Sequence, residues 1–266
     1  MLLKNKVALV TGAGRGWGQG IALAYARQGA RVMAVSRTQE ELERTQALGR
    51  AEGLEVDIQA VDLRDDAALR ALVDGTLQRY GRMDVLVNNA GRLPRKPLAE
   101  MTVGDWDRTL NLNLRAVVMT CMLYLPTMIA QGRGSIINVS SNSGINAAPT
   151  MTDYCASKFA LEGFTKSLAM EMKEQGHNIA VNTITPGGKR GRVYIKPTSM
   201  TQAQFDALPP DEQARWADPV VITEALVWLA LQDGNGLTGK RVYAWDLSDL
   251  IRHEGWDVAY DPDTYA

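Results

Sequence analysis

The amino-acid sequence predicts one α/β domain built on a single doubly wound parallel β-sheet with helices on both faces. Short apolar runs of strand length alternate with longer segments of helical periodicity, which is the pattern of repeated βαβ units. The runs are apolar throughout, as in Val7-Ala8-Leu9-Val10, and this suits strands that helices cover on both sides. The length of 266 residues and the 45% hydrophobic content suffice for one substantial core.

The expected elements follow one another in this alternating order. Strands are expected near Val7–Val10, Arg31–Val35, Val56–Ala60, Val85–Asn88, Ser135–Val139, Ala180–Ile184 and Arg241–Ala244. Hydrophobic periodicity predicts helices at about 18–28, 39–52, 66–80, 103–131, 153–175 and 219–231. These elements predict a domain at 1–245. After Pro186 the pattern loosens, and we expect a loop at 189–218 that closes over bound ligands and a C-terminal extension at 246–266 without clear periodicity.

Composition and charge exclude several classes of partner. The chain has 29 Lys and Arg residues against 30 Asp and Glu residues, so its net charge of −1 attracts neither nucleic acid nor an anionic membrane. Cys121 and Cys155 form no disulfide framework and lack metal-ligand spacing, so we expect no metal site and a cytoplasmic location. No apolar run reaches the roughly 18 residues that a membrane span needs.

Four glycines, Gly12, Gly14, Gly16 and Gly18, follow the first expected strand directly and precede a helical run. A turn between strand and helix lets backbone N–H groups and the helix N-terminus face a pyrophosphate. We therefore expect this turn, including Arg15 and Trp17, to bind a dinucleotide in a Rossmann-type fold. The alternative is an ordinary glycine-rich turn, which the strand before and the helix after make less favourable.

Ser36-Arg37 at the end of the second expected strand predicts which dinucleotide binds. No carboxylate stands there to bond an NAD ribose or repel a 2′-phosphate, and Arg37 can pair with that phosphate through its planar fork. Arg15 can approach the same group. The sequence therefore predicts NADP(H), although each arginine alone is more often a solvated charge.

Tyr154 and Lys158 open the helix expected at 153–175, and Ser141 stands at the end of the strand before it. The spacing of four residues puts Tyr154 and Lys158 on one helix face. A phenol has a pKa of about 10, and a neighbouring ammonium lowers it. The pair therefore predicts proton transfer. The alternative is that a tyrosine and a lysine share one helix face by chance, since such pairs are common.

Several motifs, in order from Lys6 to about Gly239, resemble the short-chain dehydrogenase/reductase family. These are Thr11-Gly12-x-x-x-Gly16-x-Gly18, Asn88-Asn89-Ala90-Gly91, Tyr154-x-x-x-Lys158 and Pro186-Gly187. One position departs from the pattern, because Gly191 stands where the family usually has a threonine that contacts the nicotinamide carboxamide.

The resemblance implies roles for single residues. Tyr154 would be the catalytic acid/base, Lys158 would hold the nicotinamide ribose, and Ser141 would bind the substrate oxygen. Asn113 would order a water-mediated proton relay, with Asn111 less favoured, and Ser143 is the alternative to Ser141. The further cofactor contacts that the resemblance implies are Asp62, Leu63, Asn89, Ala90, Gly91, Pro186 and Gly187. Asn88 belongs to the strand-end motif and has a structural alternative.

The sequence thus predicts an NADP(H)-dependent oxidoreductase that interconverts a carbonyl and a secondary alcohol of a small molecule. The helices expected at 103–131 and 153–175 resemble the family's dimerising pair, so we expect a homotetramer or homodimer. One alternative is a dehydratase or epimerase on the same fold, because a fold does not define the chemistry. A non-enzymatic dinucleotide sensor is the other. The complete set of Asn113, Ser141, Tyr154 and Lys158 argues against both.

Overall fold

A seven-stranded parallel sheet forms the centre of the protein, in the order β3-β2-β1-β4-β5-β6-β9. The computed structural model describes residues 1–188, 194–195, 202–213, 216–217 and 219–263. The strands of this sheet are β1 Val7–Thr11, β2 Arg31–Ser36, β3 Val56–Ala60, β4 Val85–Asn88, β5 Gly134–Val139, β6 Ile179–Thr185 and β9 Arg241–Tyr243. All seven lie where the sequence predicts strands. The predicted fold class is confirmed.

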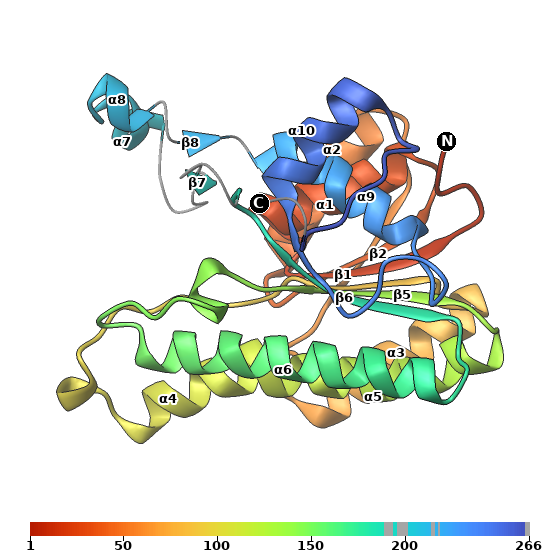
Figure 1. Ribbon diagram of the computed structural model, residues 1–266, viewed down its shortest axis with the longest axis horizontal. Coiled ribbons are helices and arrows are strands. Elements are labelled where there is room, and N and C mark those ends of the chain that lie inside the picture. The colour runs from red at the N-terminus through yellow and green to blue at the C-terminus, as the bar shows by residue number, and fades with distance from the viewer. Residues whose placement is uncertain (189–193, 196–201, 214–215, 218, 264–266) are drawn as a thin grey trace.

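Helices cover both faces of the sheet (Figure 1). On one face lie α3 Asp66–Tyr80, α4 Val103–Leu110, α5 Ala116–Ala130 and α6 Thr152–Glu174. On the other lie α1 Gly16–Arg27, α2 Gln39–Ala51, α9 Thr223–Leu231 and α10 Ala244–Glu254. Each face has its own hydrophobic core, because alternate side chains of the strands point to opposite sides. The strand order reverses beside β1, where ligands bind in this architecture.

The helix expected at 103–131 is interrupted. A π-helical turn, Asn111–Arg115, separates α4 from α5. Its central residue Asn113 is fully buried, and its side chain accepts a hydrogen bond from the Arg92 N–H at 2.9 Å and donates one to the Arg92 carbonyl at 2.9 Å. Single π turns occur often at functional sites. Hydrophobic periodicity does not reveal this turn, because the apolar face continues through it.

Val103–Ala130 is also the one helical stretch among the described residues that is long and apolar enough to cross a membrane by length and composition. A core helix of a parallel sheet passes the same test. Here Cys121, Tyr124 and Met128 of α5 are buried in the core shared with β4 and β5, so this face of the helix packs against the sheet.

Helix α10 lies in the segment for which the sequence shows no clear periodicity. Ala244, Leu247, Ser248 and Ile251 are buried at helical spacing, and the three apolar ones join the core that α1 and α9 form. This spacing predicts a helix, but the segment is short and acidic residues flank the apolar ones, so the periodicity is weak in the sequence. A Cβ added to Gly188 would lie 2.5 Å from Asp246 Oδ1, so the chain leaving β6 runs directly against the first turn of α10.

The expected loop at 189–218 is described only in pieces. Two-residue strands, β7 Tyr194–Ile195 and β8 Trp216–Ala217, pair with each other, and α7 Gln202–Asp206 and α8 Pro210–Gln213 lie between them in the chain. Residues 189–193, 196–201, 214–215 and 218, among them Gly191 and the basic residues around it, lie outside the described residues.

Candidate active site

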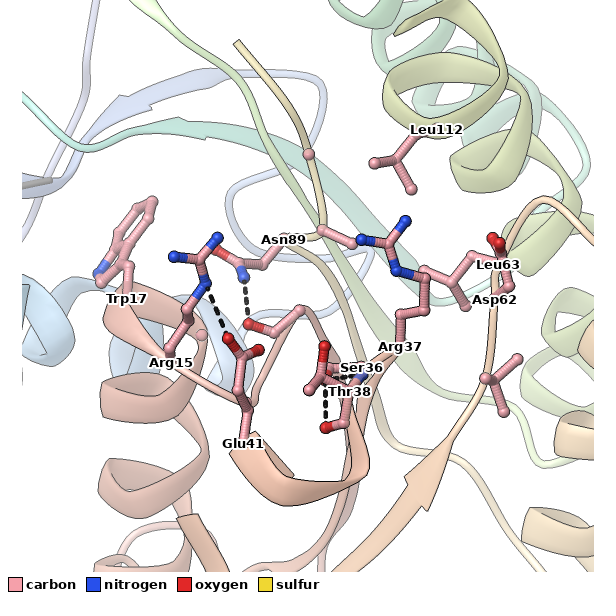
Figure 2. A pocket seen from close by; sticks show the side chains of 16 residues that line it. Arg15, Trp17, Ser36, Arg37, Thr38, Glu41, Asp62, Leu63, Asn89 and Leu112 are labelled. Carbon is pink, nitrogen blue, oxygen red and sulfur yellow. Dashed lines mark hydrogen bonds and ion pairs between the residues drawn. The ribbon is translucent and has the colours of Figure 1, made fainter. Parts of the chain in front are cut away.

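An open cleft of about 370 Å³ lies beyond the carboxyl ends of β1 to β4 (Figure 2). Its lining includes twelve residues of the predicted cofactor site: Gly12, Gly14, Arg15, Trp17, Gly18, Ser36, Arg37, Asp62, Leu63, Asn89, Ala90 and Gly91. Four further residues line the cleft without belonging to any predicted site: Thr38, Glu41, Val61 and Leu112. Gly16, Tyr154, Lys158, Pro186 and Gly187, which the sequence also assigns to the cofactor, are not among the lining residues.

The turn after β1 has the backbone shape that an anion site requires. Gly12 has a φ of +67°, a conformation that L side chains rarely adopt. A Cβ added to Gly18 would lie 2.2 Å from the Gly12 carbonyl oxygen, so the turn and the helix are in direct contact. No side chain caps the N-terminus of α1, and no acidic residue lies in its first turn. The free N–H groups and the helix dipole therefore suit the pyrophosphate of a dinucleotide.

The loop after β4 is held against this turn by Thr11. Its hydroxyl accepts hydrogen bonds from the N–H groups of Asn89 at 2.9 Å and Ala90 at 3.0 Å, and it donates to the Val87 carbonyl. The Asn89 side chain in turn donates to the Thr11 carbonyl at 2.9 Å. The two loops thus form one continuous wall of the cleft.

Two arginines of the cleft have different surroundings. Arg15 forms an ion pair with Glu41 of α2 at 3.4 Å, and 61% of the Arg15 side chain is exposed. Arg37 is exposed and contributes only a coulombic effect on Asp62. In Figure 2 the two guanidinium groups extend from opposite sides of the cleft, with Ser36 and Thr38 between them. Arg37 is therefore the cation with more charge available for a phosphate.

Asp62 follows β3 and lies beside the cleft. Arg64 holds its carboxylate with two side-chain hydrogen bonds, of 2.9 and 2.5 Å, and these lower the pKa of Asp62 to about 2. The carboxylate is therefore ionised at neutral pH and can accept hydrogen bonds from a ligand.

Tyr154, Ser141 and Lys158 come together at the carboxyl end of β5. Tyr154 is only 8% exposed, and burial raises the pKa of its phenol. A hydrogen bond with the Ser141 side chain lowers that pKa by a smaller amount. The net shift is opposite to the one that the sequence analysis expects from Lys158. The physical reason is that burial penalises the phenolate more than the neighbouring groups stabilise it.

Lys158 lies one helical turn beyond Tyr154, as the spacing predicts. Its Nζ is 5.7 Å from the centre of the Tyr154 ring and donates a hydrogen bond of 2.7 Å to the Val139 carbonyl. The side chain is buried, and burial lowers the pKa of Lys158 to about 8, while the Glu162 carboxylate acts in the opposite direction. The ammonium form therefore predominates at pH 7.

Asn113 connects the cleft to α6, the helix that carries Tyr154 and Lys158. Besides its bonds to Arg92, its Nδ2 lies 3.3 Å from the Ser157 hydroxyl on α6. A Cβ added to the cleft residue Gly91 would lie 3.4 Å from Asn113 Oδ1. The π turn thus holds the loop after β4 against the helix that carries Tyr154.

Asn88 and Ser143, the residues for which the sequence leaves alternative roles open, lie in different surroundings. The Asn88 side chain is buried and bonds Asn138 at 2.9 Å and Thr120 at 2.7 Å, which agrees with its structural alternative. The Ser143 N–H donates to the Ser141 hydroxyl at 3.1 Å, so Ser141 begins a tight turn in which Ser143 supports it.

Known proteins match both the sequence and the fold. Residues 6–205 match the family described as short chain dehydrogenase. The 3-oxoacyl-(acyl-carrier-protein) reductase FabG of Thermotoga maritima is 37% identical over 247 residues, which cover 90% of this chain and 96% of the relative. A metagenomic short-chain oxidoreductase in complex with NADP has a TM-score of 0.76 and 32% identity, covering 91% of this chain and 98% of the other.

A carveol dehydrogenase from Mycobacterium avium in complex with NAD has a TM-score of 0.78 and 27% identity, with coverage of 91% and 96%. The similar structures therefore include complexes with both nicotinamide cofactors. The matched region contains the whole cleft and the Tyr154 group, and the resemblance found in the motifs is confirmed. The chain belongs to the short-chain dehydrogenase family of nicotinamide-dependent oxidoreductases.

Proposed function

We propose that the protein is an NADP(H)-dependent oxidoreductase that interconverts a carbonyl and a secondary alcohol, with Tyr154 as the acid/base. The observation that carries this proposal is the contact of Tyr154 with Ser141 and Lys158 at the strand ends beside a dinucleotide cleft. A sensor has no need for a buried phenol beside a hydroxyl and an ammonium, because binding alone does not require proton transfer.

The residues of the cleft fit a nicotinamide dinucleotide. The turn after β1 and the uncapped start of α1 would hold the pyrophosphate, and Asp62 and Leu63 would border the adenine. Arg37 would pair with the 2′-phosphate of NADP(H). When bound, the cofactor supplies or accepts the hydride.

The chain's own groups handle the proton and the oxygen. In the direction of reduction, the Ser141 hydroxyl donates a hydrogen bond to the substrate carbonyl oxygen, and the Tyr154 phenol transfers its proton to that oxygen. The Lys158 ammonium stabilises the phenolate that remains, because opposite charges attract strongly in a buried site. Asn113 holds the loop and the helix at the distance that this arrangement needs.

Burial raises the pKa of the Tyr154 phenol, so the phenol carries its proton at neutral pH. The protonated phenol is the form that donates a proton in carbonyl reduction, whereas alcohol oxidation needs the phenolate as a base.

The proposed cellular setting is the cytoplasm, which suits the two free, buried cysteines. We also propose that the chain forms a homotetramer or homodimer through α4–α5 and α6.

A screen of ketones and alcohols with NADPH, NADH, NADP⁺ and NAD⁺, followed by nicotinamide absorbance, tests the proposed activity. Turnover of a carbonyl with a loss in the Tyr154→Phe variant supports it. Binding of cofactor without turnover of any carbonyl or alcohol would favour the sensor, and release of water or inversion of a stereocentre without net hydride transfer would favour the dehydratase or epimerase.

A further inference from the structure

A polar cluster that the reaction scheme does not use lies behind Ser141, between the sheet and α6. Its centre is the ion pair of Glu162 on α6 with Arg241 on β9, whose side chains are 19% and 13% exposed. The Glu162 carboxylate also accepts hydrogen bonds from the hydroxyls of Ser140 at 2.5 Å and Thr183 at 2.8 Å. The cluster therefore joins β5, β6, β9 and α6 at one point.

Arg241 reaches from this cluster to the backbone of the catalytic loop. Its second terminal nitrogen donates a hydrogen bond of 2.6 Å to the carbonyl of Ser141, a residue 100 positions earlier in the chain. The Ser141 hydroxyl in turn accepts from the Ser143 N–H, and the Ser141 carbonyl also accepts from the Gly144 N–H at 2.9 Å. The Arg241 guanidinium thus bonds Ser141, the residue that also accepts the hydrogen bonds of the turn from Ser143 and Gly144.

The loop packs closely against α6 at Gly144. A Cβ added to Gly144 would lie 2.9 Å from the Ser140 hydroxyl, 3.1 Å from the Lys158 carbonyl and 3.2 Å from Glu162 Cγ. The loop therefore rests directly on the turn of α6 that carries Lys158. A shift of either Glu162 or Arg241 would move Ser141 relative to Tyr154.

The ion pair is a poor candidate for a purely stabilising feature. Buried ion pairs often contribute little net stability, because the cost of removing two charges from water offsets their attraction. The Arg241 Nε–H is buried without a hydrogen-bond partner in the described structure, which adds to that cost. The planar guanidinium of Arg241 instead suits a bridging role, because its two terminal nitrogens bond Glu162 and the Ser141 carbonyl in a fixed geometry.

We propose that Arg241 and Glu162 are positioning residues that hold the Ser141 backbone, so that its hydroxyl faces Tyr154 and the substrate oxygen. This inference rests on the proposed function for its effect on catalysis, but the bond from Arg241 to the loop can be tested without substrate. Arg241 lies on the last strand, outside every motif that the sequence analysis uses.

The test compares Arg241→Met and Arg241→Lys with Arg252→Met. Arg252 is a matched control, because it donates to the Val221 carbonyl at 2.7 Å, lies 3.5 Å from Glu224 and stacks 6.0 Å from the Trp245 ring, away from Ser141. Arg241 makes the same three kinds of contact, with its guanidinium 5.5 Å from the Tyr243 ring. Arg241→Lys keeps a charge for Glu162 but loses the planar fork, so it tests the geometry if the methionine variant does not fold.

The first measurement is hydrogen exchange of residues 140–146. We expect faster exchange of the Ser143 and Gly144 amides in both Arg241 variants and no change there in Arg252→Met. Unchanged exchange in the Arg241 variants would overturn the proposal, whether or not a substrate is known.

The second measurement is steady-state kinetics with a carbonyl that the wild-type protein reduces. A displacement of about 1 Å at a reacting group can cost about a hundredfold in rate, so we expect kcat to fall by at least about tenfold in both Arg241 variants. The Kd of NADPH should stay within about threefold of the wild type, because Arg241 does not line the cleft. A kcat within about twofold of the wild type, or an equal fall in Arg252→Met, would overturn the positioning role. Absence of any wild-type turnover would instead count against the proposed function.

Discussion

Arg15 and Glu41 form an ion pair of 3.4 Å at the edge of the proposed cofactor cleft. The carboxylate lies beside Gly14, since a Cβ added to Gly14 would lie 3.1 Å from Glu41 Oε2. A phosphate that approaches Arg15 therefore meets a negative charge. Arg15, which the sequence predicts to approach the same 2′-phosphate as Arg37, is therefore already partly neutralised.

Replacing Glu41 with Gln should lower the KM for NADPH several-fold and leave that for NADH nearly unchanged. The substitution removes the charge that competes with the 2′-phosphate but keeps the size of the side chain. Initial rates with both cofactors measure the effect, with Glu40→Gln on the same helix as a control. Equal changes for the two cofactors would mean that Glu41 does not face the 2′-phosphate.

In the unaltered protein we expect NADPH to exceed NADH by at least about tenfold in kcat/KM, which corresponds to about 1.4 kcal/mol. Arg37→Asp should erase or reverse this preference, because it replaces the exposed cation after β2 with a carboxylate that can bond a free ribose. Comparable kcat/KM values for both cofactors in the wild type would contradict the proposed NADP(H) preference.

Tyr154→Phe should remove nearly all turnover and leave NADPH binding within a few-fold, because it deletes the acidic proton and keeps the buried ring. Lys158→Ala should impair both turnover and binding. Single-turnover rates and a fluorescence titration with NADPH separate the two effects. A phenylalanine variant that retains more than about a tenth of the rate would refute the role of Tyr154.

The rate of carbonyl reduction should be constant at pH values well below 8 and fall as the pH rises through about 8, because burial lowers the pKa of the Lys158 ammonium to about 8. Tyr154 does not cause this fall, since burial raises the pKa of the phenol above its ordinary value. The Glu162 carboxylate raises the pKa of Lys158, so Glu162→Gln should move the inflection to lower pH. A pH–rate profile of kcat checks both statements, and an inflection that does not move in the Gln variant would exclude this electrostatic link.

Sedimentation at micromolar concentration should show a dimer or tetramer. Met122 on α5 and Phe159 and Met170 on α6 are 62%, 46% and 62% exposed. Phe159 and Met170 are about three helical turns apart, so they share one face of α6, and apolar side chains gathered on one face suit a surface that a second copy covers. Phe159→Glu should dissociate the assembly, whereas Leu48→Glu, at a similarly exposed position on α2, should not. A wild-type monomer would contradict the proposed oligomer.

Much of the fold follows from local sequence. The apolar runs predict all seven strands of the sheet, and β9 ends one residue early because Ala244 begins α10. The glycine turn is equally local, since the strand before it, the positive φ of Gly12 and the helix after it involve neighbouring residues. Spacing along one helix likewise predicts that Tyr154 and Lys158 share a face.

Other features depend on packing between distant segments. Asn113 in the π turn bonds the backbone of Arg92, which lies 21 residues earlier in the loop after β4, and hydrophobic periodicity does not register this contact. The direction of the Tyr154 pKa shift depends on burial, which spacing does not measure.

The sequence by itself determined the parallel sheet, the dinucleotide turn and the identity of the Tyr154–Lys158 pair, because each depends on residues within a strand, a turn or a helix. Only the tertiary structure decided that Glu41 partly neutralises Arg15, and that Arg241 holds the Ser141 carbonyl from 100 residues away. The physical reason is that short-range periodicity specifies elements, whereas the energy of a buried charge or hydrogen bond depends on whichever distant groups the packed core brings against it.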